Sequence, residues 1–394
     1  MADAVLTINA GSSSLKFSLY RVGDDGEPAA ALEGAIEGIG TEPHMKAKDA
    51  GGGDLVDRRW QDKGMDHAAF FRVLREWLRE QLGDTRLAGV GHRVVHGGTE
   101  FAAPVRTDND VLAKLEALCP LAPLHQPHNL AGIRAVAAAQ PDLPQVACFD
   151  TAFHRAHSEL ADWFALPRRF YDDGIRRYGF HGLSYEYIAG ALPSVAPELK
   201  DARVVVAHLG SGASMCAMRA GRSVDSTMGF TALDGLPMGT RSGALDPGVV
   251  LHLIRAYRMD ADAIEAMLYH NCGLKGVSGI SNDMRNLLAS DDPHAAQAIE
   301  LFVWHIAKQL GALFAVLGGV DAFVFTAGIG ERSPEIRRRV CARLGWLGIA
   351  LDEAANRAGG PRISTAGSKV AVFAIPTDEE LMIARHTLAV LNGA

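Results

Sequence analysis

Each half of the chain has, near its start, one short loop rich in glycine and serine. The first is Asn9–Lys16 (Asn-Ala-Gly-Ser-Ser-Ser-Leu-Lys) and the second is His208–Ser214 (His-Leu-Gly-Ser-Gly-Ala-Ser). Backbone N–H groups and hydroxyls at such turns suit phosphate oxygens, and Lys16 adds a positive charge. A polar β-turn would give the same pattern, and the GxxxxGK[ST] spacing of a Walker A loop is absent. The loops therefore favour phosphate contact of another kind.

Two arginines occupy positions where a positive charge needs a partner. Arg93 lies among apolar residues of an expected buried strand, and Arg241 lies in the glycine-rich segment 238–243. An isolated buried charge is costly, and the guanidinium fork matches a carboxylate or a phosphate. An internal salt bridge would also explain Arg93. With Lys16, the two arginines could spread the charge of a transferring phosphoryl group.

Asp150 and His181 are the other candidates for chemistry. Asp150 follows the apolar run 145–149, and the ends of strands in α/β sheets are where sites usually lie. A helix N-cap would explain an aspartate there equally well. His181 stands between glycines in the segment 177–182, which permits close backbone approach. A lone histidine is more often structural, but these glycines favour a functional role.

Two further segments each follow an expected strand and precede an expected helix. Gly328–Glu331 (Gly-Ile-Gly-Glu) has the pattern of a backbone that approaches a nucleotide beside a helix N-terminus. Pro376–Glu380 (Pro-Thr-Asp-Glu-Glu) offers carboxylates that could hold Mg²⁺. Simple compensation of the helix dipole is the better explanation of the second segment when it is taken alone.

An α/β fold is needed to position these residues. Periodicity and turn residues predict both element types along the chain. Strands are expected at 4–8, 15–20, 32–36, 55–59, 87–95, 145–149, 204–208, 322–326 and 370–375. Helices are expected at 66–82, 108–118, 129–139, 246–257, 260–269, 292–317 and 379–391, with another from about 333. Pro120, Pro123 and Pro127 predict an irregular loop before the third helix.

The repeated strand–loop–strand pattern suggests a duplicated α/β domain with a cleft between the two copies. A chain of 394 residues also favours two domains. We place the first domain at 1–150 and the second at 151–378. The closing helix, 379–394, is expected to pack back on the first domain.

Composition and charge exclude several classes of protein. The net charge of -7 gives no basic surface for nucleic acid or anionic membranes. Five scattered cysteines without a CxxC pair argue against disulfides or zinc and fit a reducing compartment. The N-terminus lacks the pattern of a signal peptide, and polar residues interrupt the apolar stretch 299–317, which favours a buried helix. We expect a cytoplasmic protein without nucleic-acid or membrane partners.

Taken together, the motifs closely resemble the acetate kinase family, which includes the propionate and butyrate kinases. Eight of them occur in the family's order, and the resemblance runs from residue 5 to about residue 388. They are NAGSSSLK from Asn9, HRVVHGG from His92, FDTAFH from Phe149, RYGFHG from Arg177, HLGSGAS from His208, GLPMGTRSG from Gly235, GIGE from Gly328 and PTDEEL from Pro376.

The resemblance implies two ribonuclease-H-like domains of the actin-like, sugar-kinase-like ATPase type around an active-site cleft, and a homodimer. It implies phosphoryl transfer between ATP and a small carboxylate with Mg²⁺, or Mn²⁺, as the metal. Asn9 and Glu379 would hold the metal, while Ser12, Ser14 and Lys16 would approach the phosphates. Catalytic roles would fall to Arg93, Asp150, His181 and Arg241. Nucleotide contacts would come from His208, Leu209, Gly210, Ser211, Gly212, Asp283, Met284, Arg285, Gly328, Ile329, Gly330, Glu331 and Arg332. The acyl pocket would be lined by Val95, Leu124, Phe180 and Ala232, with Arg93 also binding the substrate.

The chain departs from the family pattern at three of these positions. Ser211 replaces the usual asparagine of the second phosphate loop, and Arg332 replaces the asparagine that usually follows GIGE. Ala232 stands where proline is common, which leaves room for a larger acyl group. A propionate kinase is therefore the nearest alternative, although Val95 narrows the pocket. An actin-like ATP-hydrolysing module is the alternative from another class, but it would not need Arg93, His181 and Arg241.

Overall fold

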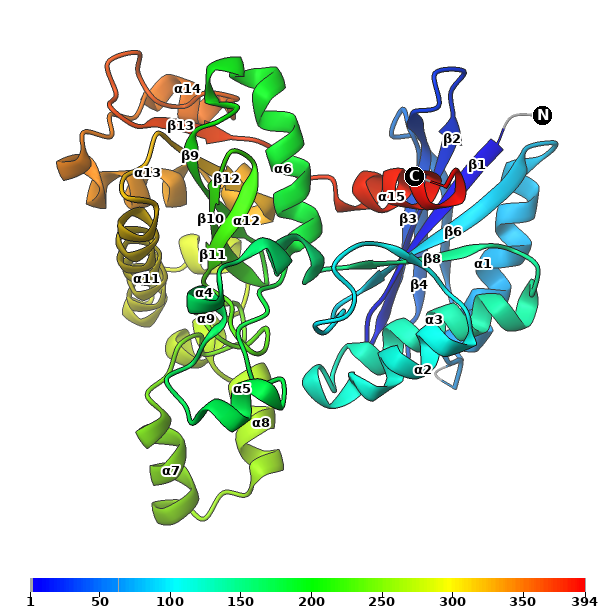
Figure 1. The fold of residues 1–394 in the computed structure, drawn as a ribbon, viewed down its shortest axis with the longest axis horizontal. Helices are drawn as coiled ribbons and strands as arrows, with labels where there is room; N and C mark the ends of the chain where they lie inside the picture. Colours follow the sequence, from blue (N-terminus) through cyan, green and yellow to red (C-terminus); the bar gives the residue numbers. More distant parts are fainter. Residues whose placement is uncertain (1–2, 63, 394) are drawn as a thin grey trace. The chain divides into compact units, whose positions relative to one another are not determined.

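The computed structural model describes residues 3–62 and 64–393, and the chain divides into two compact units. Unit 1 comprises Met1–Phe153 and Asp378–Ala394, and unit 2 comprises His154–Thr377. Each unit contains one β-sheet with helices on both faces (Figure 1).

The sheet of unit 1 has eight strands in the order β5-β4-β3-β2-β1-β6-β8-β7. Strands β1 and β2 form an antiparallel hairpin, whereas β6 and β8 run parallel to β1, so the carboxyl ends of these three parallel strands share one edge. The strands are β1 (Asp3–Ala10), β2 (Ser14–Val22), β3 (Pro28–Glu37), β4 (His44–Asp49), β5 (Asp54–Arg59), β6 (Arg86–Val94), β7 (Val105–Arg106) and β8 (Gln145–Phe149).

Both faces of the central strands in unit 1 are buried. Leu6 and Ile8 of β1 pack in a cluster with Phe70 and Leu74, whereas Val5 packs with Leu388 on the opposite face. This double burial explains why β1 is a nearly continuous apolar run. The helices are α1 (His67–Leu82), α2 (Asn109–Ala117) and α3 (Gln126–Ala139), while α15 (Glu379–Leu391) covers the face that Val5 occupies.

Unit 2 repeats the arrangement of a hairpin followed by parallel strands. Its sheet has the order β11-β10-β9-β12-β13, in which β9 and β10 form the hairpin and β12 and β13 are parallel to β9. The strands are β9 (Arg203–Leu209), β10 (Ala213–Arg219), β11 (Arg222–Ser226), β12 (Ala322–Thr326) and β13 (Ala371–Ala374).

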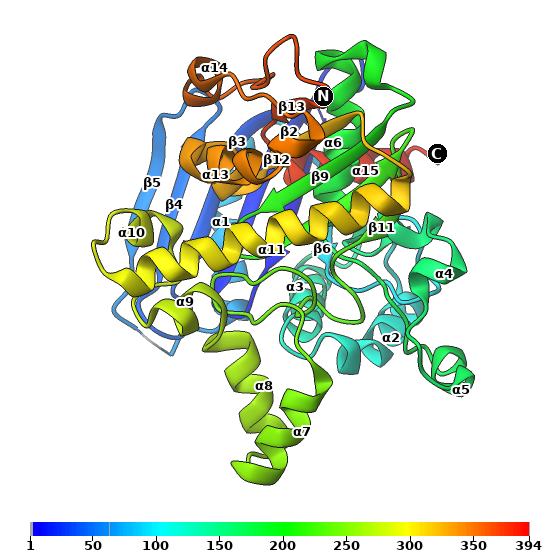
Figure 2. The same ribbon diagram turned by 90° about the vertical axis from the view of Figure 1, so that its left-hand side faces the viewer.

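Helices cover both faces of the second sheet. The long helix α11 crosses one face (Figure 2), and α6 lies on the other. The helices are α4 (Glu159–Asp162), α5 (Arg168–Asp172), α6 (Gly182–Val195), α7 (Pro247–Ala256), α8 (Ala261–His270), α9 (Gly273–Ser278), α10 (Met284–Leu288), α11 (Pro293–Leu317), α12 (Ala327–Arg332), α13 (Pro334–Arg343) and α14 (Glu353–Ala358).

The helix α11 is long and apolar enough to cross a membrane, and it is alone in this among residues 3–62 and 64–393. Its residues Phe302, Ile306 and Leu310 are buried, and the helix packs on β9, β10 and β11. This packing confirms the expectation that the apolar stretch 299–317 forms a core helix.

The expected strands and helices are confirmed with small shifts at their ends, and two predictions were wrong. Helix α3 begins at Gln126 and not at 129, because Pro127 occupies its first turn, where the missing N–H costs nothing. The segment after β12 was expected to be a loop, but Ala327–Arg332 forms helix α12. Other elements were not expected at all, namely strands β4, β7 and β11 and helices α4, α5, α6, α9, α10 and α14.

Candidate functional site

Three strand ends in unit 1 bring Arg93, Asp150 and Asn9 together. The guanidinium of Arg93 donates from Nε to Asp150 Oδ1 (2.9 Å) and from Nη2 to Asp150 Oδ2 (2.5 Å). Its third nitrogen, Nη1, donates to Asn9 Oδ1 (3.3 Å). The Asp150 side chain is only 3% exposed, whereas that of Arg93 is 20% exposed. An internal ion pair therefore exists, and it fixes the orientation of the Arg93 fork.

This ion pair raises the pKa of Arg93. Burial by itself lowers the pKa of the guanidinium, but the charge and hydrogen bonds of Asp150 outweigh it and raise the pKa. Arg93 is therefore permanently charged, and its charge is held at the carboxyl edge of the sheet.

Glu379, the first residue of α15, lies beside this cluster. Burial raises the pKa of its carboxyl to about 7; Arg93 and Lys16 lower it, whereas Asp150 and Glu380 raise it further. A buried carboxylate, Asp150, and a half-buried one, Glu379, at one place favour a bound cation. Lys16 faces Asn9 across the hairpin and is exposed.

The oxygens of Asn9, Asp150 and Glu379 suit a divalent metal. The described residues contain no group of three or more His, Cys, Asp or Glu side chains arranged for a metal ion. Mg²⁺, however, is usually held by one or two carboxylates together with water and substrate phosphates. The donor set of unit 1 fits that mode, in which the substrate completes the coordination.

The first phosphate loop is a tight turn at the end of β1. Gly11 N donates to Ser14 O (2.8 Å), and Ser12 is exposed at the tip. Asn129 of α3, which sequence reasoning did not single out, donates to Ala10 O (2.7 Å) and accepts from Val95 N (3.0 Å). It therefore ties the loop to the end of β6.

The expected acyl-pocket residues are divided between the units. Val95 of unit 1 is buried, and Leu124 is half-buried in the loop before α3. In unit 2, Phe180 is buried and Ala232 is half-buried.

In unit 2, His181 and Arg241 approach the second phosphate loop. A Cβ atom added to Gly212 would lie 3.4 Å from His181 Nε2 and 3.5 Å from Arg241 Nη2. The loop itself is a tight turn in which Gly210 N donates to Gly212 O (3.0 Å), and Ser211 is exposed at its tip. A ring nitrogen and a guanidinium thus converge beside a loop suited to phosphate.

The same unit places His208 against His181. The two imidazole rings are stacked, with centroids 4.1 Å apart. Arg241 is anchored from behind, since its Nη1 donates to Ala232 O (2.8 Å). The anchor places Ala232 next to Arg241, although the sequence motifs separate them.

The remaining expected nucleotide contacts lie on α10 and α12. Asp283 caps α10 and pairs with Arg285 (2.5 Å), which is exposed. Leu209, Met284 and Gly330 are buried, so a nucleotide would contact their backbone atoms and not their side chains. Gly328 and Arg332 are exposed, and Ile329 is half-buried. Glu331 Oε1 accepts from Thr377 N (3.0 Å), which ties α12 to the segment that follows β13.

Arg337 is a structural residue that the sequence analysis missed. Its side chain is buried, and Nη1 donates to Gly330 O (2.8 Å) and Glu331 O (2.6 Å). Its Nε donates to Asn356 Oδ1 (2.7 Å). It holds the last turn of α12, and no sequence motif marks it because it lies in an arginine-rich helix.

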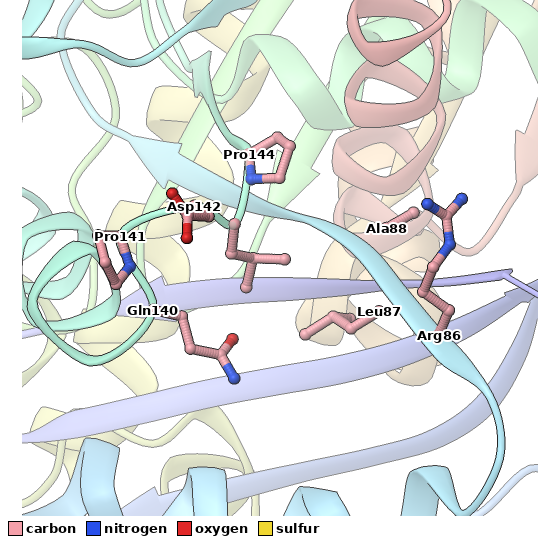
Figure 3. Close-up of a pocket in the computed structure, with 8 residues that line it drawn as sticks. Arg86, Leu87, Ala88, Gln140, Pro141, Asp142 and Pro144 are labelled. Carbon is pink, nitrogen blue, oxygen red and sulfur yellow. The ribbon is translucent and has the colours of Figure 1, made fainter.

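A cavity of about 700 Å³ in unit 1 lies away from these residues (Figure 3). It is lined by Arg86–Ala88 at the start of β6 and by 140–144 just before β8. It therefore occupies the amino edge of the sheet, whereas Arg93 and Asp150 stand at the carboxyl edge.

The sequence profile of the Acetokinase family matches residues 4–385. The chain belongs to the acetokinase family. It is 56% identical to a protein named acetate kinase from Rhodopseudomonas palustris over the full length of both chains. It is 53% identical to a protein of the same name from Nitrobacter hamburgensis, covering 99% of this chain and 96% of the relative.

Solved structures of the acetokinase family have the same fold. A propionate kinase from Francisella tularensis superposes with a TM-score of 0.91 at 36% identity, over 98% of each chain. An acetate kinase from Porphyromonas gingivalis superposes with a TM-score of 0.88 at 35% identity, covering 99% of this chain and 100% of its own. The protein is thus a phosphotransferase with the two-domain, actin-like ATPase fold, as the resemblance implied.

Proposed function

We propose that the chain catalyses the reversible, Mg²⁺-dependent transfer of a phosphoryl group between ATP and acetate, giving ADP and acetyl phosphate. The observation that carries the choice of acetate is the full-length match, at 56% identity, to a protein named acetate kinase. The clustering of Arg93, Asp150 and Glu379 in unit 1, and of His181 and Arg241 in unit 2, supports phosphoryl transfer.

The transfer is proposed to be direct and in line. Acetate is already an anion, so the reaction needs positioning and charge neutralisation more than a base. Asp150 therefore orients Arg93 through two hydrogen bonds and abstracts no proton. Arg93 binds the carboxylate. The residues that the family resemblance implies for the acyl group are Val95 and Leu124 in unit 1, and Phe180 and Ala232 in unit 2.

Unit 2 supplies the groups that bear on the nucleotide and the phosphoryl group. Arg241 and His181, beside Gly212, stabilise the charge of the phosphoryl group in flight. The nucleotide contacts are those that the family resemblance implies, from His208–Gly212, 283–285 and 328–332. Asn9 and Glu379 would hold the Mg²⁺ ion, with Ser12, Ser14 and Lys16 near the phosphates; when bound, the ion neutralises phosphate charge.

A propionate kinase is the second candidate. Ala232 is half-buried and smaller than the proline common in the family, and the propionate kinase from Francisella tularensis is similar over 98% of its chain. One methylene changes the free energy of binding by only about 1–3 kcal/mol. We therefore expect activity with both acids and a preference for acetate.

A hydroxamate assay for acyl phosphate tests this function directly. The purified chain is incubated with ATP, Mg²⁺ and acetate, propionate, butyrate or no acid. Acetate-dependent product, with less from propionate, supports the proposal. Propionate equal to or better than acetate changes the substrate but not the mechanism. ATP hydrolysis without acyl phosphate would refute the kinase and favour an ATP-hydrolysing module.

We further propose that the chain is a cytoplasmic homodimer, and that units 1 and 2 are its two ribonuclease-H-like domains. The repeated order of hairpin and parallel strands in the two sheets supports the duplication. The apolar residues exposed on α7 of unit 2 support a partner surface.

A further inference from the structure

The ring of His181 is fixed by two hydroxyl groups that the proposed mechanism does not use. His181 Nδ1 lies 2.8 Å from Ser214 Oγ, and Ser214 Oγ in turn forms a short hydrogen bond with the hydroxyl of Tyr185. Ser214 and Tyr185 are both fully buried. Ser214 lies on β10 and Tyr185 on α6, and both follow His181 in the sequence.

His181 also has a backbone conformation that needs support. It is the residue before α6, with φ 58° and ψ 25°, in the left-handed region that favours glycine. A non-glycine residue stays in this region when its surroundings hold it there, and such strain gathers at functional positions. The buried hydroxyl pair supplies a restraint on the side chain.

The order of acidity sets the direction of the hydrogen bonds. A phenol is a stronger donor than an aliphatic hydroxyl, so Tyr185 donates to Ser214 Oγ. The Ser214 hydroxyl then keeps its own proton, which it can donate to His181 Nδ1 when that nitrogen is unprotonated. In this arrangement the ring proton is on Nε2, the atom that faces the Gly212 loop.

We propose that Ser214 and Tyr185 are positioning residues that hold His181 as the neutral tautomer with its proton on Nε2. In this form Nε2–H is a hydrogen-bond donor aimed at the phosphate loop. Arg241 Nη2 lies 3.5 Å from the Cβ position of Gly212 that His181 Nε2 also approaches, so its charge disfavours a positively charged His181 ring. The ring of His208 stacks on one face of the His181 ring. The proposal rests on the proposed function only for the catalytic use of this donor.

Nuclear magnetic resonance of the full chain labelled with ¹⁵N-histidine tests the tautomer without any activity measurement. At pH 8 the His181 signals, assigned by their loss in His181→Ala, are expected to show a protonated Nε2 and a bare Nδ1. Tyr185→Phe, which removes one oxygen only, should weaken this preference. A ring protonated on Nδ1, or on both nitrogens, would overturn the proposal.

Kinetics provide the second test. Tyr185→Phe and Ser214→Ala are expected to lower kcat by about 10- to 100-fold, in the range found for partners that orient a ligand, with little change in KM for acetate. In a His181→Ala background the same changes should have almost no further effect, because the pathway runs through His181. Additive losses would contradict the positioning role.

A matched control is available elsewhere in unit 2. Ser364 is also buried, and its Oγ accepts from Val372 N (3.0 Å). Ser364→Ala should leave kcat within about twofold. If the wild-type protein forms no acyl phosphate, the proposed function fails, whereas the tautomer measurement still decides the inference.

Discussion

At the scale of single residues, Arg93 is the side chain on which the acid-binding step depends. Arg93→Ala is expected to lower kcat/KM by about 100- to 1,000-fold, equivalent to about 3–4 kcal/mol, because one preorganised cationic donor is lost. Arg93→Lys should recover only part of the kcat/KM that is lost in Arg93→Ala, since a lysine cannot reproduce the two hydrogen bonds to Asp150. Steady-state kinetics in the direction of acyl phosphate synthesis measure both variants.

The control for this prediction lies on the same strand. Arg86, at the other end of β6, forms an equivalent two-bond pair with Asp3 (2.8 and 2.5 Å), but in solvent. Arg86→Ala should therefore leave kcat unchanged within about twofold. A similar loss in both variants would show that Arg93 acts through the stability of β6.

His92, the neighbour of Arg93, makes a prediction about pH. It is buried with Nε2 2.8 Å from the Gln145 amide, and burial lowers its pKa from 6.5 to about 4. Below pH 6.5 His92 is protonated in the unfolded chain but stays neutral in the folded chain. The free energy of unfolding therefore falls as the pH drops from 6.5 towards 4. At pH 5 the loss from this group is about 2 kcal/mol.

The variant His92→Gln should remove that part of the pH dependence. Urea unfolding at pH 7 and pH 5 is the measurement, and the difference between the two pH values should be smaller in the variant by about 2 kcal/mol. The buried His154, whose pKa burial also lowers, keeps a residual acid loss in both proteins. Equal pH dependence in wild type and variant would contradict the assignment to His92.

At the scale of elements, Arg337 of α13 holds helix α12 in place. Arg337→Leu would leave Gly330 O, Glu331 O and Asn356 Oδ1 without their donor. Since a buried acceptor left unsatisfied costs about 1–3 kcal/mol, we expect a loss of at least about 3 kcal/mol in stability. The KM for ATP should rise as well, and hydrogen exchange across 327–332 should quicken. Arg338→Ala, an exposed neighbour paired with Glu335, should change stability by less than about 1 kcal/mol.

The same element shows where sequence reasoning reaches its limit. Strands such as β1 and β9 could be predicted because both faces are buried and the runs are apolar. Helix α12 was expected to be a loop because two glycines lower its helix propensity. Tertiary contacts offset this, including the hydrogen bonds from Arg337 and the packing of α12 on β9 and β12. Helix α6 was not expected because glycine and Pro193 interrupt its apolar pattern.

The candidate site divides in the same way. The sequence motifs name Arg93 and Asp150, and the rule of strand ends predicts that both lie at one edge. Their pairing joins residues 57 positions apart, so a single sequence does not reveal it. Ser214 belongs to the motif HLGSGAS, but its contact with His181 is visible only in the fold. Asn129 and Tyr185 carry no local signal, because the sequence does not show which polar residues will be buried and paired.

At the scale of the whole molecule, we predict a homodimer whose interface includes helix α7. Among its described residues none is buried, although most are apolar, and α7 projects from unit 2 with α8 (Figure 2). Leu245, Val249, Leu251, Ile254 and Tyr257 are between 41% and 68% exposed. Three of these residues lie on α7, and Leu245 and Tyr257 flank it. Exposed apolar side chains in such a group are typical of a surface for association.

We expect a second copy of the chain to bind this surface, because its charges are complementary to themselves. Asp246 stands at the N-terminus of α7 and Arg255 at the C-terminus, and both are exposed. In a two-fold interface the same patch meets itself, so antiparallel packing of two α7 helices would place Asp246 of each copy near Arg255 of the other. A stable interface buries about 800 Å² per partner, so α7 would form its apolar centre with neighbouring residues at the rim.

Light scattering coupled to size exclusion measures the outcome. The wild-type chain should elute with twice the mass of the 42.0 kDa chain, and Leu251→Asp should shift it to the monomer, because a charge buried in the interface without a partner is costly. Leu160→Asp is the matched control, since Leu160 is 81% exposed on α4 and lies outside the patch. A monomeric wild type would refute the dimer, whereas a dimer that persists in Leu251→Asp would move the interface away from α7.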